Sequence, residues 1–359
     1  MKRIDYYLVT TVGMTMLLAV IGLLGILSIF TLIEQVEDIQ NNYTLVDVLV
    51  FVILSMPRMF YEIAPYAALI GCLAGLGILA NNSELLVMRA AGISTWDIAA
   101  SAMKPALLLV VIALYVGEYI LPDVEKSARI SREQALSKDN KISTAEGFWY
   151  REDNTYMHFD EVGQGGVIVG VSHYYYDDNH VLNRTLYAER GVFHDVRANE
   201  QYWLLENVVV TDIHQLKTQT TQLTSLRWDS SLVPDLLNTE ILIQPDKMSI
   251  GELSAKIAYM EAQGLNSGKF RLGYWRKVLQ PLATIALVFM AISFIFGPLR
   301  EATMGMRVVT GLVIGIIFKF VQDLLSPASM VFGFEPVIAI SLPILACFIL
   351  AYFLFRRAG

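Results

Sequence analysis

The stretch LVTTVGMTMLLAVIGLLGILSIFTLI, residues 8–33, contains 26 consecutive residues without a charged side chain. A helix needs about 20 apolar residues to cross the roughly 30 Å hydrocarbon core of a bilayer, because each residue advances it by about 1.5 Å. The run is too long for the apolar core of a signal peptide, and no small-residue cleavage site follows it. We therefore expect residues 8–33 to form a retained membrane-spanning helix.

Five further apolar runs follow along the chain. All six runs qualify as membrane-spanning helices by length, so the pattern predicts a six-helix membrane protein. The five further runs are residues 48–79, 105–121, 278–299, 308–325 and 336–355.

The composition agrees with a membrane protein, although a net charge of −7 is unusual for one. Apolar residues make up 55% of the chain and charged residues 17%, against about 45–50% and about 25% in soluble domains. Such apolar content excludes disorder, and the lack of a basic balance disfavours nucleic-acid binding. Residues 122–269 hold 14 Lys and Arg against 22 Asp and Glu, whereas the other 211 residues hold 13 and 12. The chain is therefore a nearly neutral apolar part with an acidic, polar insert.

Basic residues are distributed unevenly over the ends of the predicted spans. The short loops at residues 34–47 and 326–335 contain no Lys or Arg, while the opposite ends are basic. By the positive-inside rule, the basic ends face the cytoplasm. We therefore expect both termini in the cytoplasm and the insert on the outer side of the membrane. The basic ends carry Lys2, Arg3, Arg89, Lys104, Arg300, Arg307, Arg356 and Arg357.

The insert has the pattern of a mainly β domain. Short stretches rich in Tyr, Val, Thr and Trp recur in it, with Asn and Gly between them. This spacing favours a sandwich or jelly roll over alternating strands and helices. Flanking helices are predicted at residues 122–136 and 249–263, where Ser249 and Glu252 form a capping-box pattern. The predicted strands are residues 147–151, 156–162, 166–176, 185–196, 201–211 and 218–228.

The predicted fold class is an α-helical membrane protein with six transmembrane helices and an inserted all-β, jelly-roll-like domain. Its expected parts are residues 1–121 with helices one to three, residues 122–269 with the β domain and its flanking helices, and residues 270–359 with helices four to six. Residues 264–270 resemble a phosphate loop, but they have three rather than four residues between the glycines, and Phe270 replaces the magnesium-binding hydroxyl. We expect neither catalysis nor a metal site in this chain.

The loop between the second and third predicted spans has the pattern of a short helix at about residues 82–92. Ser83 or Asn82 is suited to cap its beginning, Leu85 and Met88 share one face, and Gly92 ends it. Such an amphipathic helix can dock in a groove of a partner protein. The pattern is equally compatible with a turn helix on the bilayer surface, so both interpretations stay open.

Charged side chains near the membrane mark candidate binding positions, because charges in a bilayer are costly and are usually paired or functional. Two pairs of opposite charges lie four residues apart within predicted spans, and each either neutralises itself or lines a passage for an anionic cargo. Two arginines just outside span three either grip phosphates bidentately or form a solvated helix face. The pairs are Arg58 with Glu62 and Lys319 with Asp323, and the arginines are Arg129 and Arg132.

Three segments of the sequence carry a resemblance to a known family. They are SELLVM at residues 83–88 with Ala91-Gly92, FIFGPLR at residues 294–300, and MGMRVVTG at residues 304–311. Together with the order of three spans, an external β domain and three spans, these segments resemble the LptF/LptG permease family of lipopolysaccharide export. The resemblance covers essentially the whole chain.

The resemblance implies a permease subunit of an ABC transporter. The transporter extracts lipopolysaccharide from the outer leaflet of the inner (cytoplasmic) membrane and passes it to a periplasmic bridge. The implied partners are the homologous permease LptF, the cytoplasmic ATPase LptB, the membrane-anchored LptC and the bridge protein LptA. ATP and magnesium then act in the ATPase, and no cofactor is expected in this chain. The alternative is a membrane receptor or scaffold with an external β domain that transports nothing.

The resemblance also implies candidate site residues. The helix after span two is the family's coupling helix, and its residues here are Glu84, Leu85, Met88 and Arg89. Basic residues at the outer membrane face contact phosphates and acidic sugars of the lipid, and the matching positions are Arg58, Arg129, Arg132 and Lys277. The outer end of span one departs from some members, because acidic residues stand where lysines can occur. These acidic residues are Glu34, Glu37 and Asp38.

Overall fold

The structure is a computed structural model, and it divides the chain into two compact units that we describe separately. A helical unit consists of residues 1–37, 52–125 and 245–359, and a β unit consists of residues 38–51 and 126–244. The structure describes residues 2–39, 43–136, 141–152, 154–163, 166–177, 181–195, 201–214, 217–230, 232, 234, 245–262, 267–299 and 302–358.

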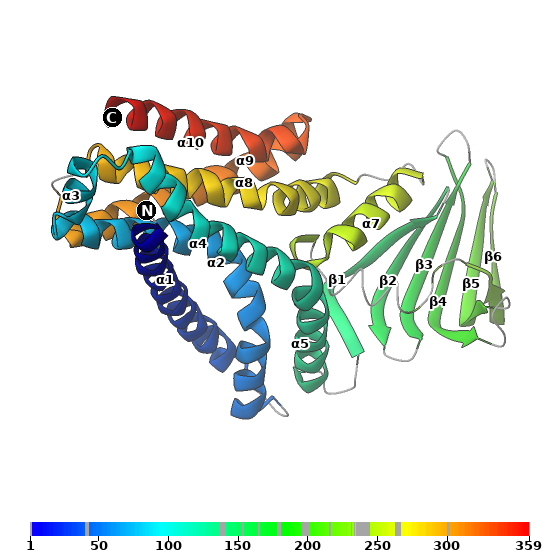
Figure 1. Cartoon of the computed structure of the whole chain (residues 1–359). Helices are drawn as coiled ribbons and strands as arrows, with labels where there is room; N and C mark the ends of the chain where they lie inside the picture. Colours follow the sequence, from blue (N-terminus) through cyan, green and yellow to red (C-terminus); the bar gives the residue numbers. More distant parts are fainter. Residues whose placement is uncertain are drawn as a thin grey trace. The chain divides into compact units, whose positions relative to one another are not determined.

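Six helices in the described residues are long and apolar enough to cross a membrane, which confirms the predicted spans (Figure 1). The third span is one continuous helical stretch, because α4 leads through a π-helix, η1 (Val116–Ile120), into α5 (Leu121–Leu136). The helix α5 confirms the predicted continuation beyond span three. In chain order, the six spans are formed by α1 (Lys2–Glu37), α2 (Leu45–Asn81), α4 (Thr95–Tyr115) with its continuation, α8 (Gly268–Phe296), α9 (Met304–Phe332) and α10 (Pro336–Ala358).

The helical unit is organised around α2. In the most apolar window of each span, 72% of α2 is buried, against 11% of α1 and 17% of α9. Leu69, Leu73 and Leu76 of α2 are fully buried in one core with Ile98 of α4 and Leu287 of α8. Because lipid solvates apolar side chains as well as a protein core does, the exposed apolar faces of α1 and α9 are stable in a bilayer.

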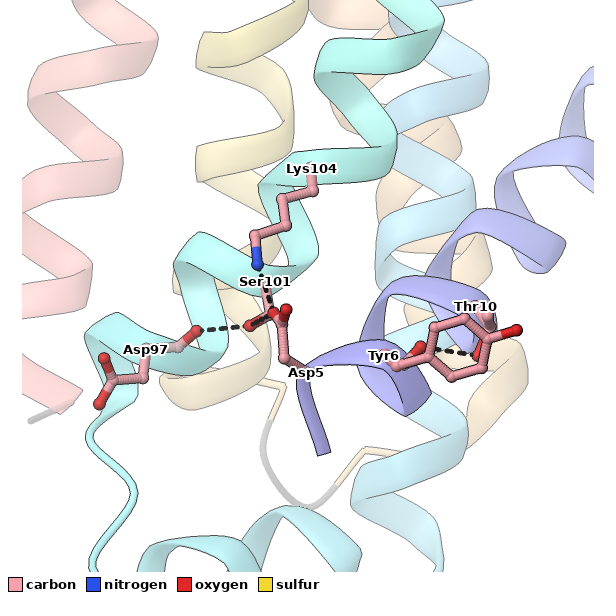
Figure 2. Close-up of polar contacts among 6 residues, drawn as sticks. All are labelled: Asp5, Tyr6, Thr10, Asp97, Ser101 and Lys104. Atoms are coloured by element: carbon pink, nitrogen blue, oxygen red, sulfur yellow. Dashed lines mark hydrogen bonds and ion pairs between the residues drawn. The ribbon is translucent and has the colours of Figure 1, made fainter. Parts of the chain in front are cut away.

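A polar cluster joins the first turn of α1 to α4 (Figure 2). The Asp5 carboxylate accepts hydrogen bonds from Ser101 Oγ at 2.6 Å and from Lys104 Nζ at 2.5 Å. The Ser101 hydroxyl also lies 2.9 Å from the Asp97 carbonyl within α4. Further along α1, Thr15 Oγ1 donates to the Gly71 carbonyl of α2 at 2.8 Å. These bonds fix the position of α1, whose apolar surface is mostly exposed.

The β unit contains one antiparallel sheet with its six described strands in sequence order (Figure 1). The inserted β domain and its six predicted strands are therefore confirmed. Each strand pairs with the next one along the chain, whereas the strands of a jelly roll cross over in Greek keys. The strands are β1 (Lys141–Glu152), β2 (Thr155–Gly163), β3 (Val167–Tyr176), β4 (Leu182–Asp195), β5 (Gln201–His214) and β6 (Lys217–Trp228).

One face of the sheet carries an apolar core. Trp203, Phe159, Ile168 and Leu205 are fully buried there, and Trp203 Nε1 donates to the Leu232 carbonyl at 2.7 Å. In β3 the buried residues are Ile168 and Gly170 and then Val171 and His173, so the two-residue period of a strand holds on each side of the step from Gly170 to Val171.

After the sheet, a short helix η2 (Pro245–Lys247) and then α7 (Ile250–Ala262) return the chain to the helical unit. The predicted capping box is confirmed: Ser249 N and Oγ lie 2.7 and 2.9 Å from Glu252 Oε2, and Glu252 N donates to Ser249 Oγ at 3.1 Å. The predicted end of this helix at Gly264 lies outside the described residues. The predicted domain ranges stay a prediction.

Candidate functional site

A cavity of about 220 Å³ lies among α2, α8 and α9 in the helical unit. Apolar and aromatic side chains such as Tyr61, Tyr66 and Phe318 form part of its wall. Among the described residues, its charged lining has four cations and three anions, so the cavity combines an apolar wall with a slightly positive set of charges. The charged lining residues are Arg58, Glu62, Asp246, Arg276, Lys277, Lys319 and Asp323.

Asp323 holds two of the cavity's cations in exposed ion pairs. Its carboxylate lies 2.9 Å from Lys319 Nζ and 3.7 Å from Arg276 Nη2. The side chains of Lys319, Asp323 and Arg276 are 61%, 47% and 41% exposed. Because these residues line the cavity, we expect water to reach the pairs, and pairs that water reaches contribute only about 0–1 kcal/mol, so another anion can displace the carboxylate at little cost. The sequence left two interpretations open for Lys319 and Asp323, mutual neutralisation or a lining for a cargo, and the structure shows the ion pair that the first requires.

Arg58 takes part in a second, buried ion-pair network. Glu125, whose side chain is 3% exposed, lies 3.1 Å from Lys247 Nζ and 3.6 Å from Arg58 Nε. The ion pair of Arg58 is therefore with Glu125 on α5, while Glu62 is an exposed lining residue of the cavity. A buried carboxylate between two cations is costly to disrupt, because a remaining cation is left uncompensated. This network orients Arg58 at the cavity wall.

Lys277 is buried at the same wall and binds the π-helix. Its Nζ donates to the Gly117 carbonyl at 3.0 Å and lies 5.3 Å from the centre of the Tyr61 ring. A π-helix shifts the backbone pairing by one residue, which makes a carbonyl accessible to such a donor. Next to it, Glu118 accepts hydrogen bonds from the backbone N–H groups that begin α7, at 2.8 and 3.3 Å. Lys277 and Glu118 thus tie the third and fourth spans to α7 beside the cavity.

Arg129 and Arg132, the other predicted lipid-binding residues, lie on α5 in the β unit. Arg132 Nη2 is paired with the Asp38 carboxylate at 2.6 Å, and its guanidinium lies 5.8 Å from the centre of the Phe51 ring. Burial raises the pKa of the neighbouring Tyr43, and the positive charge of Arg132 opposes that shift. Asp38, an acid that follows the first span, thus neutralises a predicted cationic position.

The structure brings two of the four predicted lipid-binding residues, Arg58 and Lys277, into one cavity. Arg276 and Lys319, the more exposed cations of that cavity, are not among the predicted lipid-binding residues. The sequence held a signal for both. Lys319 has an acid four residues later, and Arg276 belongs to a basic cluster at the beginning of the fourth span.

The predicted short helix between spans two and three is α3 (Glu84–Ala90). The residue before it, Ser83, has a left-handed backbone with φ of 60°, and its side chain makes no capping hydrogen bond, so the predicted Ser83 cap is wrong. The Asn82 side chain instead donates to the Glu84 carboxylate at 3.2 Å. Gly92 ends the helix as predicted, with φ of +87°, a value that glycine adopts without strain.

Two opposite faces of α3 have different surroundings. Leu85 and Met88 are buried in the core of the helical unit, which confirms that they share a face. Leu86 and Val87 are 59% and 65% exposed. Leu85 and Met88 therefore attach α3 to its own chain, and Leu86 and Val87 provide the apolar surface open to a partner. The predicted coupling residues Glu84 and Arg89 are partly exposed at the edges of these faces.

A membrane protein with an inserted β domain, a polar cavity among its spanning helices and a short surface helix between two spans has the architecture of a transport permease. The profile of the family described as lipopolysaccharide export system permease LptF/LptG matches residues 6–357. The chain belongs to this family and acts as a permease in lipopolysaccharide export, as the resemblance predicted.

Two curated relatives agree with this assignment. The chain is 34% identical over 319 residues to the lipopolysaccharide export system permease protein LptG of Escherichia coli K12, and the match covers 89% of this chain and 88% of that protein. It is 31% identical over 318 residues to the protein of the same name from Haemophilus influenzae, with the same two shares covered.

Proposed function

We propose that this chain works as the permease half of an ABC transporter that extracts lipopolysaccharide from the outer leaflet of the inner membrane. It pairs with the homologous permease LptF, and each permease docks on a copy of the ATPase LptB. LptC and the bridge protein LptA receive the lipid in the periplasm. ATP and magnesium are bound by LptB, and this chain contributes no cofactor and no bond chemistry.

The observation that carries the proposal is the set of exposed ion pairs at the cavity wall. Lipopolysaccharide has apolar acyl chains and an anionic head group, so it requires an apolar surface beside exchangeable cations. The cavity places Arg276 and Lys319 within reach of one carboxylate, Asp323, in pairs that are weak because they are exposed. A lipid phosphate, which binds Arg and Lys by charge-assisted hydrogen bonds, competes with that carboxylate. The lipid is bound when its phosphate displaces the Asp323 carboxylate from the cations, and it is released when the cations pair with Asp323 again.

In this cycle, the ATPase acts on the permease through α3. Its exposed residues Leu86 and Val87 fit an apolar groove of the ATPase, and its buried residues Leu85 and Met88 transmit movement into the helical core. Nucleotide shifts the complex between two states only as far as it binds them differently, so α3 must move with the ATPase. This proposal includes both termini in the cytoplasm and the β domain in the periplasm, as the basic residues predict.

The test uses the complete complex reconstituted into proteoliposomes with lipopolysaccharide. We expect the Arg276→Gln, Lys319→Gln double variant to lower photocrosslinking of the lipid to this chain by at least roughly tenfold, since hydrogen bonds to charged groups contribute about 1.5–3 kcal/mol each. Arg271→Gln is the matched control, because Arg271 pairs with Glu335 at 3.1 Å and does not line the cavity. Unchanged crosslinking in the double variant rejects the cavity as the lipid site. A wild-type complex that releases no lipid with ATP indicates instead a scaffold that transports nothing.

A further inference from the structure

Arg307 is a buried cation that neither the cavity nor the exposed face of α3 accounts for. It lies in the first turn of α9 and is 1% exposed. A positive charge near the beginning of a helix is unfavourable, because the helix dipole is positive there. Burying an arginine adds a further desolvation cost. The contacts that compensate both costs show what the residue does.

These contacts come from the ends of two other helices. Arg307 Nη1 donates to the Gly77 carbonyl at 2.6 Å and to Asn81 Oδ1 at 2.8 Å, both in the last turns of α2. Its Nε donates to the Leu299 carbonyl, just after α8, at 3.2 Å. The C-terminal end of a helix carries partial negative charge, which favours a cation placed there. One guanidinium therefore joins the beginning of α9 to the ends of α2 and α8.

The backbone of α2 is shaped for this arginine. A Cβ atom on Gly77 would lie 2.9 Å from Arg307 Cδ and 3.3 Å from its Nη1. Glycine at this position therefore allows the guanidinium to reach the carbonyl behind it. The planar fork of arginine donates to several acceptors at once, which a lysine ammonium cannot reproduce with the same geometry.

The same two helix ends hold α3. Asn81 is the last residue of α2, and only two residues lie between it and α3. Leu85 of α3 packs in one core with Phe296 and Leu299 at the end of α8. A displacement of α3 therefore displaces the carbonyls that Arg307 binds. From Arg307, α9 continues without interruption to Lys319 and Asp323 at the cavity, a distance of about 18–24 Å at about 1.5 Å per residue.

We propose that Arg307 is a positioning residue that transmits the movement of α3, through α9, to the cation–carboxylate pairs of the cavity. The inference rests on the proposed function. It adds the residue that connects ATPase docking at α3 to lipid binding in the cavity. It predicts that ATP hydrolysis continues without lipid release when Arg307 loses its hydrogen bonds to the ends of α2 and α8.

The test measures ATP hydrolysis and lipid release together in the reconstituted complex, for Arg307→Lys, Asn81→Ala and the double variant. We expect complex recovery and ATP hydrolysis near the wild-type level for Arg307→Lys. Lipid released per ATP falls at least about fivefold, which is the lower end of typical coupling between two sites. The double variant resembles the more severe single variant rather than the product of the two, because the contact that Asn81→Ala removes is one that Arg307→Lys also removes. Arg356→Lys, an exposed arginine in the last turn of α10, is the control.

Each result decides the inference. A wild-type ratio of lipid to ATP in Arg307→Lys overturns it, as does a double variant whose loss is the product of the single losses. If Arg307→Lys prevents assembly, Asn81→Ala alone decides, since it leaves the arginine in place. A normal ratio in an assembled Asn81→Ala complex then overturns the inference. Failure of the proposed function is distinct, because it removes ATP-driven lipid release from the wild-type complex as well.

Discussion

Replacing Glu125 by glutamine tests the difference between the two ion-pair networks of the cavity wall. The change keeps the size of the side chain and removes its charge. Lys247, which is 3% exposed and lies 3.1 Å from the carboxylate, is a buried cation that loses this negative charge. Breaking a buried pair from one side costs about 3–5 kcal/mol. At about 2–4 °C per kcal/mol for domains of 150–250 residues, the thermal midpoint falls by about 6–20 °C.

The matched change is Asp323→Asn in the exposed network. The side chains of Lys319 and Asp323 are 61% and 47% exposed, so losing their pair costs at most about 1 kcal/mol and shifts the midpoint by less than about 4 °C. The same change removes the carboxylate that competes with a lipid phosphate, so binding of lipopolysaccharide becomes up to about fivefold tighter.

Both quantities are measured on the purified complex in detergent, the midpoint by thermal unfolding and the affinity by titration with lipopolysaccharide. The two variants are expected to differ in opposite ways. Glu125→Gln lowers the thermal midpoint, whereas Asp323→Asn nearly keeps the midpoint and binds lipopolysaccharide more tightly. Equal midpoint shifts, or weaker lipid binding by Asp323→Asn, refute the distinction between a structural and an exchangeable network.

Three further outcomes are expected. Val87→Asp places a charge on the exposed apolar face of α3. Because burying an unpaired charge is costly, the amount of ATPase recovered with the permease falls at least about tenfold. Normal recovery excludes this face as the docking surface. The Arg129→Glu, Arg132→Glu double variant lowers lipopolysaccharide crosslinking while the complex still assembles, and unchanged crosslinking removes both from the lipid path. Trp203→Ala destabilises the β unit by about 3–5 kcal/mol in chemical unfolding, whereas the 58% exposed Trp149→Ala changes it little; similar effects contradict the assigned core.

The spanning helices were predictable because a continuous apolar run reports directly on burial in lipid. The boundaries were less so, as α8 shows. Its apolar run begins at residue 278, but the helix begins at Gly268 and includes Lys277. Lys277 remains helical and buried because the Gly117 carbonyl of another helix accepts a hydrogen bond from its Nζ. Hydropathy along one segment contains no information about that partner.

The same limit applies to the candidate site. The pairing of Lys319 with Asp323 was visible, since residues four apart share a helix face. The same spacing suggested Glu62 for Arg58, but the ion pair forms with Glu125 on another helix. Contacts between helices depend on packing, which a local pattern does not describe. The lipid and partner roles of individual residues stay predictions, because they concern molecules outside this chain.

The glycines of α2 and α9 explain why α9, rather than α1, is suited to carry movement to the cavity. A Cβ on Gly71 of α2 would lie 2.4 Å from the Cα of Met16, so the glycine lets the backbones of α1 and α2 pack closely together. On α9, a Cβ on Gly311 would meet the Cδ1 end of Leu73, a side-chain atom that a rotamer change can move aside. A helix in contact with flexible side chains slides past its neighbour more easily than one locked to backbone atoms. We therefore expect the α2–α9 contact to allow the small displacement along α9 that Arg307 is proposed to transmit.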